Sequence, residues 1–486
     1  MEKKTSQKRI QRDFEKTLTA LKKKDDFLHY QLTLNNNTVC LGYMKTAVSR
    51  EKLQKLILPY VKQENYTNLE ELKRIIPVAN SRMIEDSKLV GDHLIQGYVF
   101  IYMEKVSPQY LMVPIPLEKT RQVTIPEVEF SVVGPKEAFV EHIDTNINLV
   151  RKRLEIPDLM IKKMEVGSIT KTEVAVMYIK GVADKENVQT VTQRIQDLQI
   201  DQVIDSSYIQ QTIADNRNSP FPQLLDTERP DRIAAVLVEG KVAVFVNGSP
   251  HVLIGPTTLI EFFSAFEDYF LNWTIASAFR LIRLFAVFFS ILITPLYVAV
   301  LTHHFELIPK ALLGTLISSR TQVPFPPILE AIILELTIEL LREAGARLPT
   351  KVGQTIGIVG GIVIGTASVE AGLTSNVLLI LVALAALGSF TTPVYQMGNT
   401  IRLIRFPILL FAHVYGIFGI AICIAYIMVH LLKLTSLGRP FLEPIFPFRY
   451  KDLKDSFIRL PFGMQQKRPY AVRPTKINRK MGKDKK

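Results

Sequence analysis

The hydrophobic pattern divides the chain into two halves. Up to residue 272, apolar residues occur in short runs broken by charges, whereas long apolar runs dominate from Leu281 to Leu434. Some of these runs reach or approach the roughly 20 apolar residues that a membrane span needs, and they are residues 281–302, 352–370, 373–391 and 406–432. So many apolar runs exceed what the core of a small soluble domain carries. The sequence therefore predicts a polytopic α-helical membrane domain over residues 275–434.

The N-terminal half shows the shorter periods that are typical of α/β folds. After a basic N-terminal segment, residues 1–30, it divides into two predicted subdomains, residues 31–116 and residues 117–258. In the first subdomain a helix is predicted at residues 51–61, and strands are predicted within residues 97–116.

The second predicted subdomain repeats this alternation. A helix begun by Pro135 is expected within residues 134–154, a strand within residues 173–181, and another helix within residues 186–199. Residues 232–256 then contain three β-rich runs separated by Glu239-Gly240 and Asn247-Gly248. Because glycine supplies the positive φ that tight hairpins need, this segment predicts a three-stranded meander. The fold class expected for the soluble region is thus α/β.

An unusual segment, PFPPILEAIILELTIELLREAG, covers residues 324–345 of the membrane half and combines apolar side chains with glutamates. Its two consecutive prolines suit the start of a helix and Gly345 can end it, so a helix is predicted at residues 327–343. The glutamates on this helix are named the acidic row and are Glu330, Glu335, Glu339 and Glu343.

Three interpretations of the acidic row are open. Glu335, Glu339 and Glu343 share one helix face, which can lie in water if the helix is interfacial. Alternatively, the carboxylates line a water-filled path and attract cations, which requires repetition around an axis and therefore an oligomer. The third possibility is internal salt bridges, for example to Arg342 or Arg347. The acidic row is therefore a candidate cation path.

A ladder of glycines follows the acidic row. The glycines recur at every fourth position and are Gly353, Gly357, Gly361 and Gly365. Small residues at this spacing let helix backbones approach closely in lipid. The ladder predicts either close packing within one subunit or a seam between subunits or toward a pore.

The net charge of +13 lies mostly at the C-terminus. From Arg449 onward there are thirteen Lys or Arg against three Asp. Residues 435–486 are therefore predicted to be a basic cytoplasmic tail that meets anionic lipid headgroups. Nucleic acid is not expected as a partner, because aromatic platforms and recognition motifs are missing.

Charge also bears on topology. Positive residues favour the cytoplasmic side, and placing both termini there requires an even number of spans. Counting residues 327–343 as a fifth span moves the tail outside, so four spans are favoured. The charged N-terminus has no apolar signal-peptide core, which places the soluble half in the cytoplasm.

Known chemical motifs give no indication of an enzyme. The sequence has no GxxxxGK[ST], HExxH or GxSxG motif, and its two cysteines, Cys40 and Cys423, offer neither a disulfide framework nor a metal motif. We therefore expect no catalytic activity and no cofactor.

Several long stretches resemble the A subunits of spore germination receptors, the GerA family. In the soluble half they are GPKEAFVE (134–141), NINLVRKRL (146–154), SPFPQLLDTERPD (219–231) and EGKVAVFVNGSP (239–250). In the membrane half they are residues 324–349, residues 352–372 and IRLIRFP (401–407). Asn247 departs from the Asp common before Gly in this family, and both residues suit a turn.

The resemblance implies a role in the inner membrane of a dormant spore. Such A subunits work with a polytopic B subunit, the usual nutrient sensor, and with a C-subunit lipoprotein. Nutrient binding triggers release of monovalent cations, and the A subunit is thought to oligomerise into the channel. The family also implies two soluble α/β subdomains and cytoplasmic termini. A non-conducting scaffold and a solute transporter are the alternatives.

Overall fold

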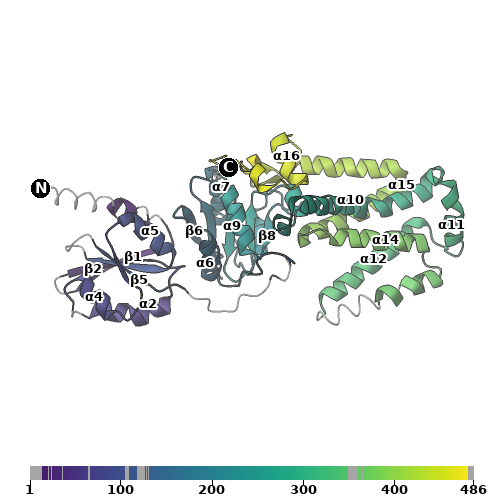
Figure 1. The fold of residues 1–486 in the computed structure, drawn as a ribbon. Coiled ribbons are helices and arrows are strands. Elements are labelled where there is room, and N and C mark those ends of the chain that lie inside the picture. The colour runs from purple at the N-terminus through teal and green to yellow at the C-terminus, as the bar shows by residue number, and fades with distance from the viewer. Residues whose placement is uncertain are drawn as a thin grey trace.

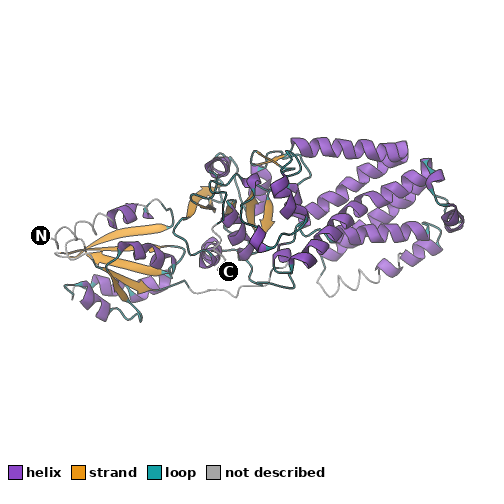
Figure 2. Ribbon diagram, turned by 45° about the horizontal axis from the view of Figure 1, so that its top comes forward, coloured by secondary structure: helices purple, strands orange, loops and turns teal. Residues whose placement is uncertain are grey.

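The computed structural model describes residues 14–479 except 20, 23, 35–36, 64–65, 104–108, 118–125, 127–128, 130, 349–359 and 364. Two sheet subdomains are followed along the molecule by a helical region, with a short C-terminal part folded back onto the second subdomain (Figures 1 and 2). The two predicted α/β subdomains are thus confirmed.

The first subdomain is built around a five-stranded antiparallel sheet of order β1-β2-β4-β5-β3. Its strands are β1 (Phe27–Leu34), β2 (Asn37–Met44), β3 (Arg82–Ile84), β4 (Tyr98–Met103) and β5 (Tyr110–Pro114). One face packs against α2 (Arg50–Leu56), α3 (Leu58–Lys62) and α4 (Leu69–Ile75), and α5 (Ser87–Ile95) covers the other. Since β1 begins at Phe27, this subdomain includes residues that the sequence pattern assigns to the N-terminal segment.

The second subdomain repeats the architecture with a sheet of order β6-β7-β9-β10-β8. Its strands are β6 (Leu159–Val166), β7 (Thr172–Ile179), β8 (Leu225–Thr227), β9 (Val242–Val246) and β10 (Val252–Gly255). On one face lie α6 (Ile143–Arg153) and α9 (Pro230–Glu239), and on the other lie α7 (Lys185–Gln196) and α8 (Ser206–Ile213).

Two local predictions in this subdomain are wrong. The first run of the predicted meander is helix α9, because Pro230 occupies a first-turn position and Ile233 and Leu237 place one apolar face on the sheet. Gly240, with φ of 104°, ends this helix instead of turning a hairpin. Helix α6 begins at Ile143, well after Pro135.

The helical region contains α10 (Trp273–His303), α11 (Lys310–Arg320), α12 (Pro327–Ala346), α14 (Asn376–Phe390) and α15 (Tyr395–Lys433). Residues 360–363 and 365–370 are also helical. Among the described residues, α10 and α15 are long and apolar enough to cross a membrane, and α14 is a shorter apolar helix. Part of the predicted span 352–370 lies outside the described residues.

The predicted span 406–432 falls on α15, which is not one continuous helix. Helix α15 is interrupted at Gly416, whose φ of 63° and ψ of −144° are not helical. A Cβ on Gly416 would lie 2.6 Å from Nε2 of His304, so the chain reverses there against the end of α10. Residues 395–415 and 417–433 therefore form two arms of a hairpin (Figure 1).

This hairpin defines two ends of the helical region. At the near end, Gln396 and His430 hydrogen-bond to Gln210 and Ser219 of the second subdomain. At the far end, Nε2 of His303 lies 2.7 Å from the carbonyl oxygen of His413. Successive helices alternate between these ends, so α15 returns the chain to the second subdomain.

The predicted basic tail, residues 435–486, is folded as far as residue 479. It forms a small hairpin of β11 (Thr435–Ser436) and β12 (Arg439–Pro440), followed by α16 (Tyr450–Phe457). Arg439 pairs with Asp184 at 2.7 Å, and Arg479 pairs with Glu239 at 3.0 Å. Part of its charge is thus paired within the protein, and contact with lipid headgroups stays a prediction.

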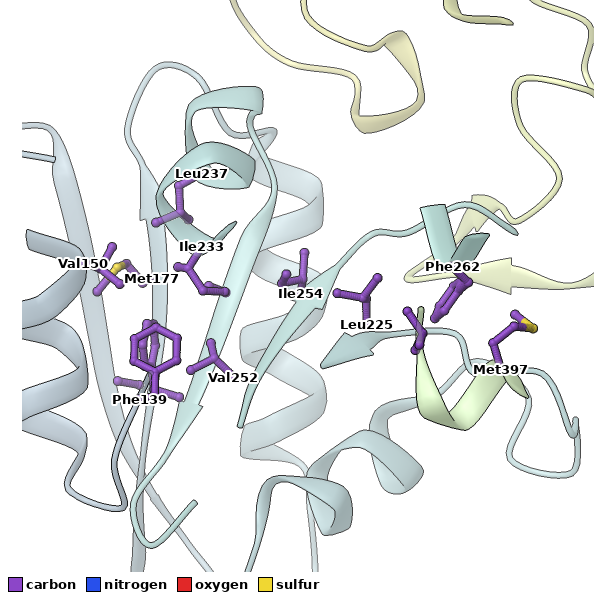
Figure 3. Packing of buried hydrophobic residues seen from close by; sticks show 14 of the residues in the cluster. Phe139, Val150, Met177, Leu225, Ile233, Leu237, Val252, Ile254, Phe262 and Met397 are labelled. Carbon is purple, nitrogen blue, oxygen red and sulfur yellow. The ribbon is translucent and has the colours of Figure 1, made fainter. Parts of the chain in front are cut away.

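A continuous apolar cluster joins the second subdomain to the helical region. It runs from Phe139 and Ile233, across the sheet, to Met397 of α15 (Figure 3). Phe441 from the tail lies in the same cluster, with its ring centroid 5.8 Å from that of Phe262. Because the second sheet and the near end of α15 share this cluster, a movement of the sheet would be transmitted directly to that helix.

The 3₁₀ helices are short. They are η1 (Leu259–Phe263), η2 (Phe266–Tyr269), η3 (Phe305–Leu307), η4 (Phe462–Met464) and η5 (Tyr470–Val472).

Candidate functional site: the acidic row of helix α12

Helix α12 carries the acidic row along the depth of the helical region. It begins at Pro327 as predicted and continues to Ala346. Near its start, Glu330 lies beside Ser375 toward the far end, whereas Arg342 near its last turn approaches Ser389 toward the near end. Neighbouring members of the row are four or five residues apart, which is about 6–7.5 Å along the helix axis. The four carboxylates are therefore placed at successive depths.

Glu335 lies at the centre of a buried network between three helices. Its Oε2 is 2.5 Å from Nη1 of Arg405 in α15, and its Oε1 accepts a hydrogen bond of 3.0 Å from Thr294 in α10. The other amino group of Arg405 donates to Ser290 at 2.9 Å. The Glu335 and Arg405 side chains are only 2% and 3% exposed. In such a dry site, the attraction between the two groups offsets part of the cost of removing them from water.

Glu330 forms a second buried pair nearer the far end. Nη2 of Arg320 in α11 lies 2.8 Å from its Oε1, and the backbone N–H of Ser375 donates to its Oε2 at 3.2 Å. The Ser375 hydroxyl meets the Tyr297 hydroxyl at 3.1 Å. Glu330 thus fastens α11 and the start of α14 to the first turn of α12.

Glu339 and Glu343 continue the row toward the near end with rising exposure. Glu339 is 30% exposed and lies 3.2 Å from Arg342 and 3.3 Å from Arg402. Glu343 is 65% exposed and pairs with Arg347 at 2.5 Å. The exposure of the glutamate side chains therefore increases along α12, from the buried far end to the exposed near end.

Within one chain, the acidic row matches the salt-bridge interpretation. The pairs to Arg342 and Arg347 follow the helical spacing that the sequence displays. Sequence reasoning missed Arg320, Arg402 and Arg405, because these partners come from other helices. The arginines of IRLIRFP in an apolar run were the available signal, since a charge there needs a partner. A cation path stays a prediction.

The predicted glycine seam is only partly visible. Gly353 and Gly357 lie outside the described residues. A Cβ on Gly361 would meet nothing within 4 Å, and one on Gly365 would make ordinary contact with Leu379. Gly388 of α14 instead approaches α10 closely, since a Cβ there would lie 2.7 Å from the carbonyl oxygen of Ala286. This contact lets α14 pack beside Ser290 and the Arg405 network.

The start of α10 is held by a second arginine cluster. Buried Arg280 donates to the carbonyl oxygen of Asp455 at 2.5 Å and lies 3.4 Å from Asp268. Arg283 also pairs with Asp268, at 3.2 Å. Burial raises the pKa of the Asp455 carboxyl, against the opposing effects of the Leu460 N–H and Arg280. Residues of the tail thereby fix the point where the chain leaves the second subdomain.

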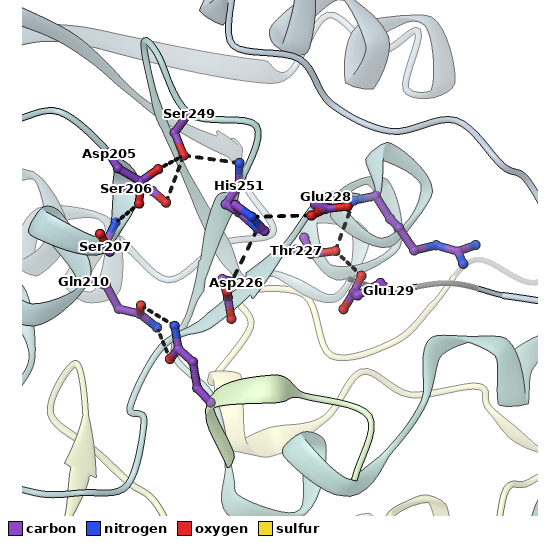
Figure 4. Close-up of polar contacts among 12 residues, drawn as sticks. Glu129, Asp205, Ser206, Ser207, Gln210, Asp226, Thr227, Glu228, Ser249 and His251 are labelled. Carbon is purple, nitrogen blue, oxygen red and sulfur yellow. Dashed lines mark hydrogen bonds and ion pairs between the residues drawn. The ribbon is translucent and has the colours of Figure 1, made fainter. Parts of the chain in front are cut away.

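A small polar cavity lies where the second subdomain meets the start of α15. It has a volume of about 10 Å³, room for about one water molecule, and Asp226, Glu228 and His251 are among its lining residues. Nε2 of His251 is 3.4 Å from Glu228, and its Nδ1 is 4.0 Å from Asp226 (Figure 4). No group of three possible metal ligands was found among the described residues.

Comparisons with known proteins place these features in one family. The sequence model of the Bacillus/Clostridium GerA spore germination protein matches residues 15–471. Spore germination protein GerQA of Bacillus cereus is 50% identical over 456 residues, which cover 94% of this chain and 91% of that protein. Spore germination protein A1 of Bacillus subtilis (strain 168) is 38% identical, with 93% of each chain covered.

One solved structure is also similar. It is the N-terminal domain of the A subunit of the Bacillus megaterium spore germinant receptor GerK3, with 27% identity and a TM-score of 0.38. The match covers 49% of this chain and 91% of that chain. Since the family match takes in both sheet subdomains, all of α12 and the α15 hairpin, the chain belongs to the Bacillus/Clostridium GerA family of spore germination proteins.

Proposed function

We propose that this chain is the membrane A subunit of a nutrient-responsive spore germination receptor, and that copies of it surround a gated path for monovalent cations. Its partners in this role are a polytopic B subunit and a lipoprotein C subunit. The relatives named as spore germination proteins support the receptor assignment.

The surface of the helical region supports a location in the membrane. Large apolar side chains point outward from α10 and α15, and among them Phe285 is 69%, Phe288 63% and Phe418 70% exposed. In water such side chains would be a liability, whereas in lipid they face hydrocarbon. The helical region begins and ends beside the second subdomain. The N-terminal sheet subdomains and the C-terminal tail therefore lie on the same side of the membrane, which we assign to the cytoplasm.

The acidic row is the observation that carries the proposed cation path. Ionisable side chains are expensive inside a membrane, and they commonly mark ion pathways where they occur. The acidic row supplies carboxylates at successive depths, from buried Glu330 to half-exposed Glu339 and exposed Glu343. Repeated around an axis by several copies, such carboxylates would select cations by their field.

A non-conducting scaffold is the second candidate function. The internal pairing of Glu330 with Arg320 and of Glu335 with Arg405 favours it, because paired charges can serve to fix helix positions. In that case the sheet subdomains would hold the partner subunits and another chain would conduct.

Nutrient-triggered potassium release distinguishes the two candidates. Vesicles would carry this chain with its B and C partners, and the variant would be Glu335→Gln with Glu339→Gln. We expect a loss of about tenfold in release, since each 1.4 kcal/mol of lost cation stabilisation is worth that factor. The matched control is Glu306→Gln, a change at an exposed glutamate of η3 outside the acidic row.

Assembly of the complex is measured in the same samples. Equal release from wild type and the double variant, with assembly intact, would remove the acidic row from the path and favour the scaffold. Uptake of a labelled solute by this chain would favour a transporter instead.

A further inference from the structure

Arginines from three helices of this chain occupy the carboxylates of the acidic row. Those of other helices are Arg320 of α11 and the neighbours Arg402 and Arg405 of α15. Each guanidinium lies within ion-pair distance of a glutamate, where a permeating cation would otherwise bind. The row is thus electrically neutralised by the chain itself.

We propose that Arg402 and Arg405 are the tethered cations of a gate. In the closed state their guanidinium groups occupy Glu339 and Glu335, and opening exchanges them for mobile monovalent cations. This inference rests on the proposed function, because it concerns the regulation of the same path.

The contacts of Arg405 suit a group that can leave its partner. Nη1 contacts Oε2 of Glu335 and Nη2 donates to Ser290, while Nε has no hydrogen-bond partner among the described residues. A buried guanidinium with an unused donor is held less completely than one whose five donors are all paired. Glu335 would keep one ligand, Thr294, after Arg405 withdrew.

The first arm of α15 connects these arginines to the soluble region. The side-chain amides of Gln396 and Gln210 exchange two hydrogen bonds, of 3.0 and 2.9 Å (Figure 4). One turn later, the Thr400 hydroxyl donates to the carbonyl oxygen of Pro220 at 2.5 Å. Arg402 and Arg405 follow on the same helix, so a rotation or shift of this arm driven by the second subdomain moves both guanidinium groups.

Such a shift needs to be only small. Ion-pair strength falls with distance, and an arginine and a potassium ion compete for the same oxygen atoms. Rigid elements with two arrangements are the usual means of carrying a signal between sites. Here the moving element is the arm at residues 395–415, and the signal reaches it at Gln396 and Thr400.

The test is potassium release without nutrient. Vesicles would carry the chain with its B and C partners, and the variants are Arg405→Gln and Arg402→Gln. We expect a nutrient-independent leak raised by about 5- to 150-fold, the range that coupling free energies of usual size produce. Combining Arg405→Gln with Glu335→Gln should abolish the leak of Arg405→Gln, because the cation then finds no carboxylate at this depth of the path.

Matched variants separate a gate from a merely structural contact. Arg405→Lys keeps the charge and should stay closed without nutrient, whereas a structural role in bridging Glu335 to Ser290 would fail with lysine. Arg217→Gln is the control at an exposed arginine of the second subdomain, outside the acidic row, and should not leak. If Arg405→Gln does not assemble, Arg402→Gln decides, since its partner Glu339 is 30% exposed and tolerates the loss.

The outcomes keep the two proposals apart. If both arginine variants remain tight while the Glu335/Glu339 double variant loses nutrient-triggered release, the gate is wrong and the cation path stands. If neither the arginine nor the glutamate variants change release, both proposals fall. A leak that persists in Arg405→Gln with Glu335→Gln would also overturn the gate, because it would bypass the carboxylate.

Discussion

The acidic row and the tail contacts use the same chemical pair in different surroundings. In the row, Arg405 of α15 meets Glu335 of α12, and in the tail contacts Arg439 and Arg479 meet Asp184 and Glu239 of the second subdomain. In the row, the Glu335–Arg405 pair is 2% and 3% exposed and is completed only by hydroxyls. Beside the tail, Asp215 of the second subdomain accepts hydrogen bonds from the Thr435 hydroxyl and the Gly438 N–H and pairs with Arg194. The Asp215 side chain is 11% exposed and that of Arg194 is 33% exposed. The Glu335–Arg405 pair is therefore dry, whereas water reaches the Asp215–Arg194 pair through Arg194 and backbone groups support it, so it is the wet pair of this comparison.

Removing one partner of the dry pair gives the largest expected effect. Arg405→Ala leaves the Glu335 carboxylate buried without its cation, which costs about 3–5 kcal/mol of stability. Thermal unfolding of the purified chain in detergent measures the loss. Replacing both residues, Arg405→Met with Glu335→Leu, should recover most of it, because apolar groups of similar volume need no partner. An unaltered melting temperature in Arg405→Ala would show that the pair is not dry.

Removing a wet pair should cost less and should depend on pH. Burial acts to raise the pKa of Asp215, but hydrogen bonds from Thr435, Arg194 and the Gly438 N–H hold it below its ordinary value. A carboxyl with a lowered folded pKa stabilises the protein above its unfolded pKa of about 3.9, and this stability is lost as the pH falls through the folded pKa.

Asp215→Asn tests this contact. The amide leaves donors unpaired, so we expect a loss of about 1.5–3 kcal/mol at neutral pH. Unfolding measured from pH 7 downward should show a weaker dependence below about pH 4 in the variant than in wild type. Parallel pH curves for the two proteins would refute the assignment.

A packing variant separates the contribution of close helix packing to stability from that of the ion pairs. Gly388→Leu forces a side chain toward the carbonyl oxygen of Ala286, 2.7 Å from the first added atom, and should cost about 1–3 kcal/mol. Gly361→Leu is the matched change at open space and should leave the stability of the single chain unaltered. If Gly361→Leu instead disrupts assembly, the glycine ladder packs between subunits, and size analysis of the complex reads this out.

The smallest effect is expected at the wet end of the row. Glu343 and Arg347 are 65% and 78% exposed, so Glu343→Gln should change stability by no more than about 0.5 kcal/mol. The same thermal measurement checks it. A loss as large as that at Arg405 would contradict the exposure of this pair.

Sequence patterns predicted the local secondary structure better than the ion pairs between helices. Periodicity and turn residues predicted the strands β4, β5 and β7 and the helix α7, because these depend on neighbours in the chain. The run at residues 230–239 was misread as a strand since Ile, Ala and Val suit either state, although Pro230 and Gly240 mark a helix with both ends defined.

The candidate site was predicted only on its own helix. Glu330, Glu335, Glu339 and Glu343 are visible in the sequence, and α12 follows from its prolines. Arg405 lies 70 residues beyond Glu335, so no spacing rule relates them. The reversal at Gly416 brings the two arms of α15 together, and a single glycine in an apolar run does not predict such a reversal.

The burial of Phe441 against Phe262 means that the second subdomain is completed late during synthesis. A ribosome making this chain releases both sheets first, then every helix, and only afterwards the residues that close the apolar cluster of the second subdomain. That subdomain therefore waits for its final pieces until the helices have been made. A chain truncated among the helices would leave an apolar surface uncovered, where chaperones and proteases recognise incomplete products. The fold thus carries its own check that translation has passed Phe441.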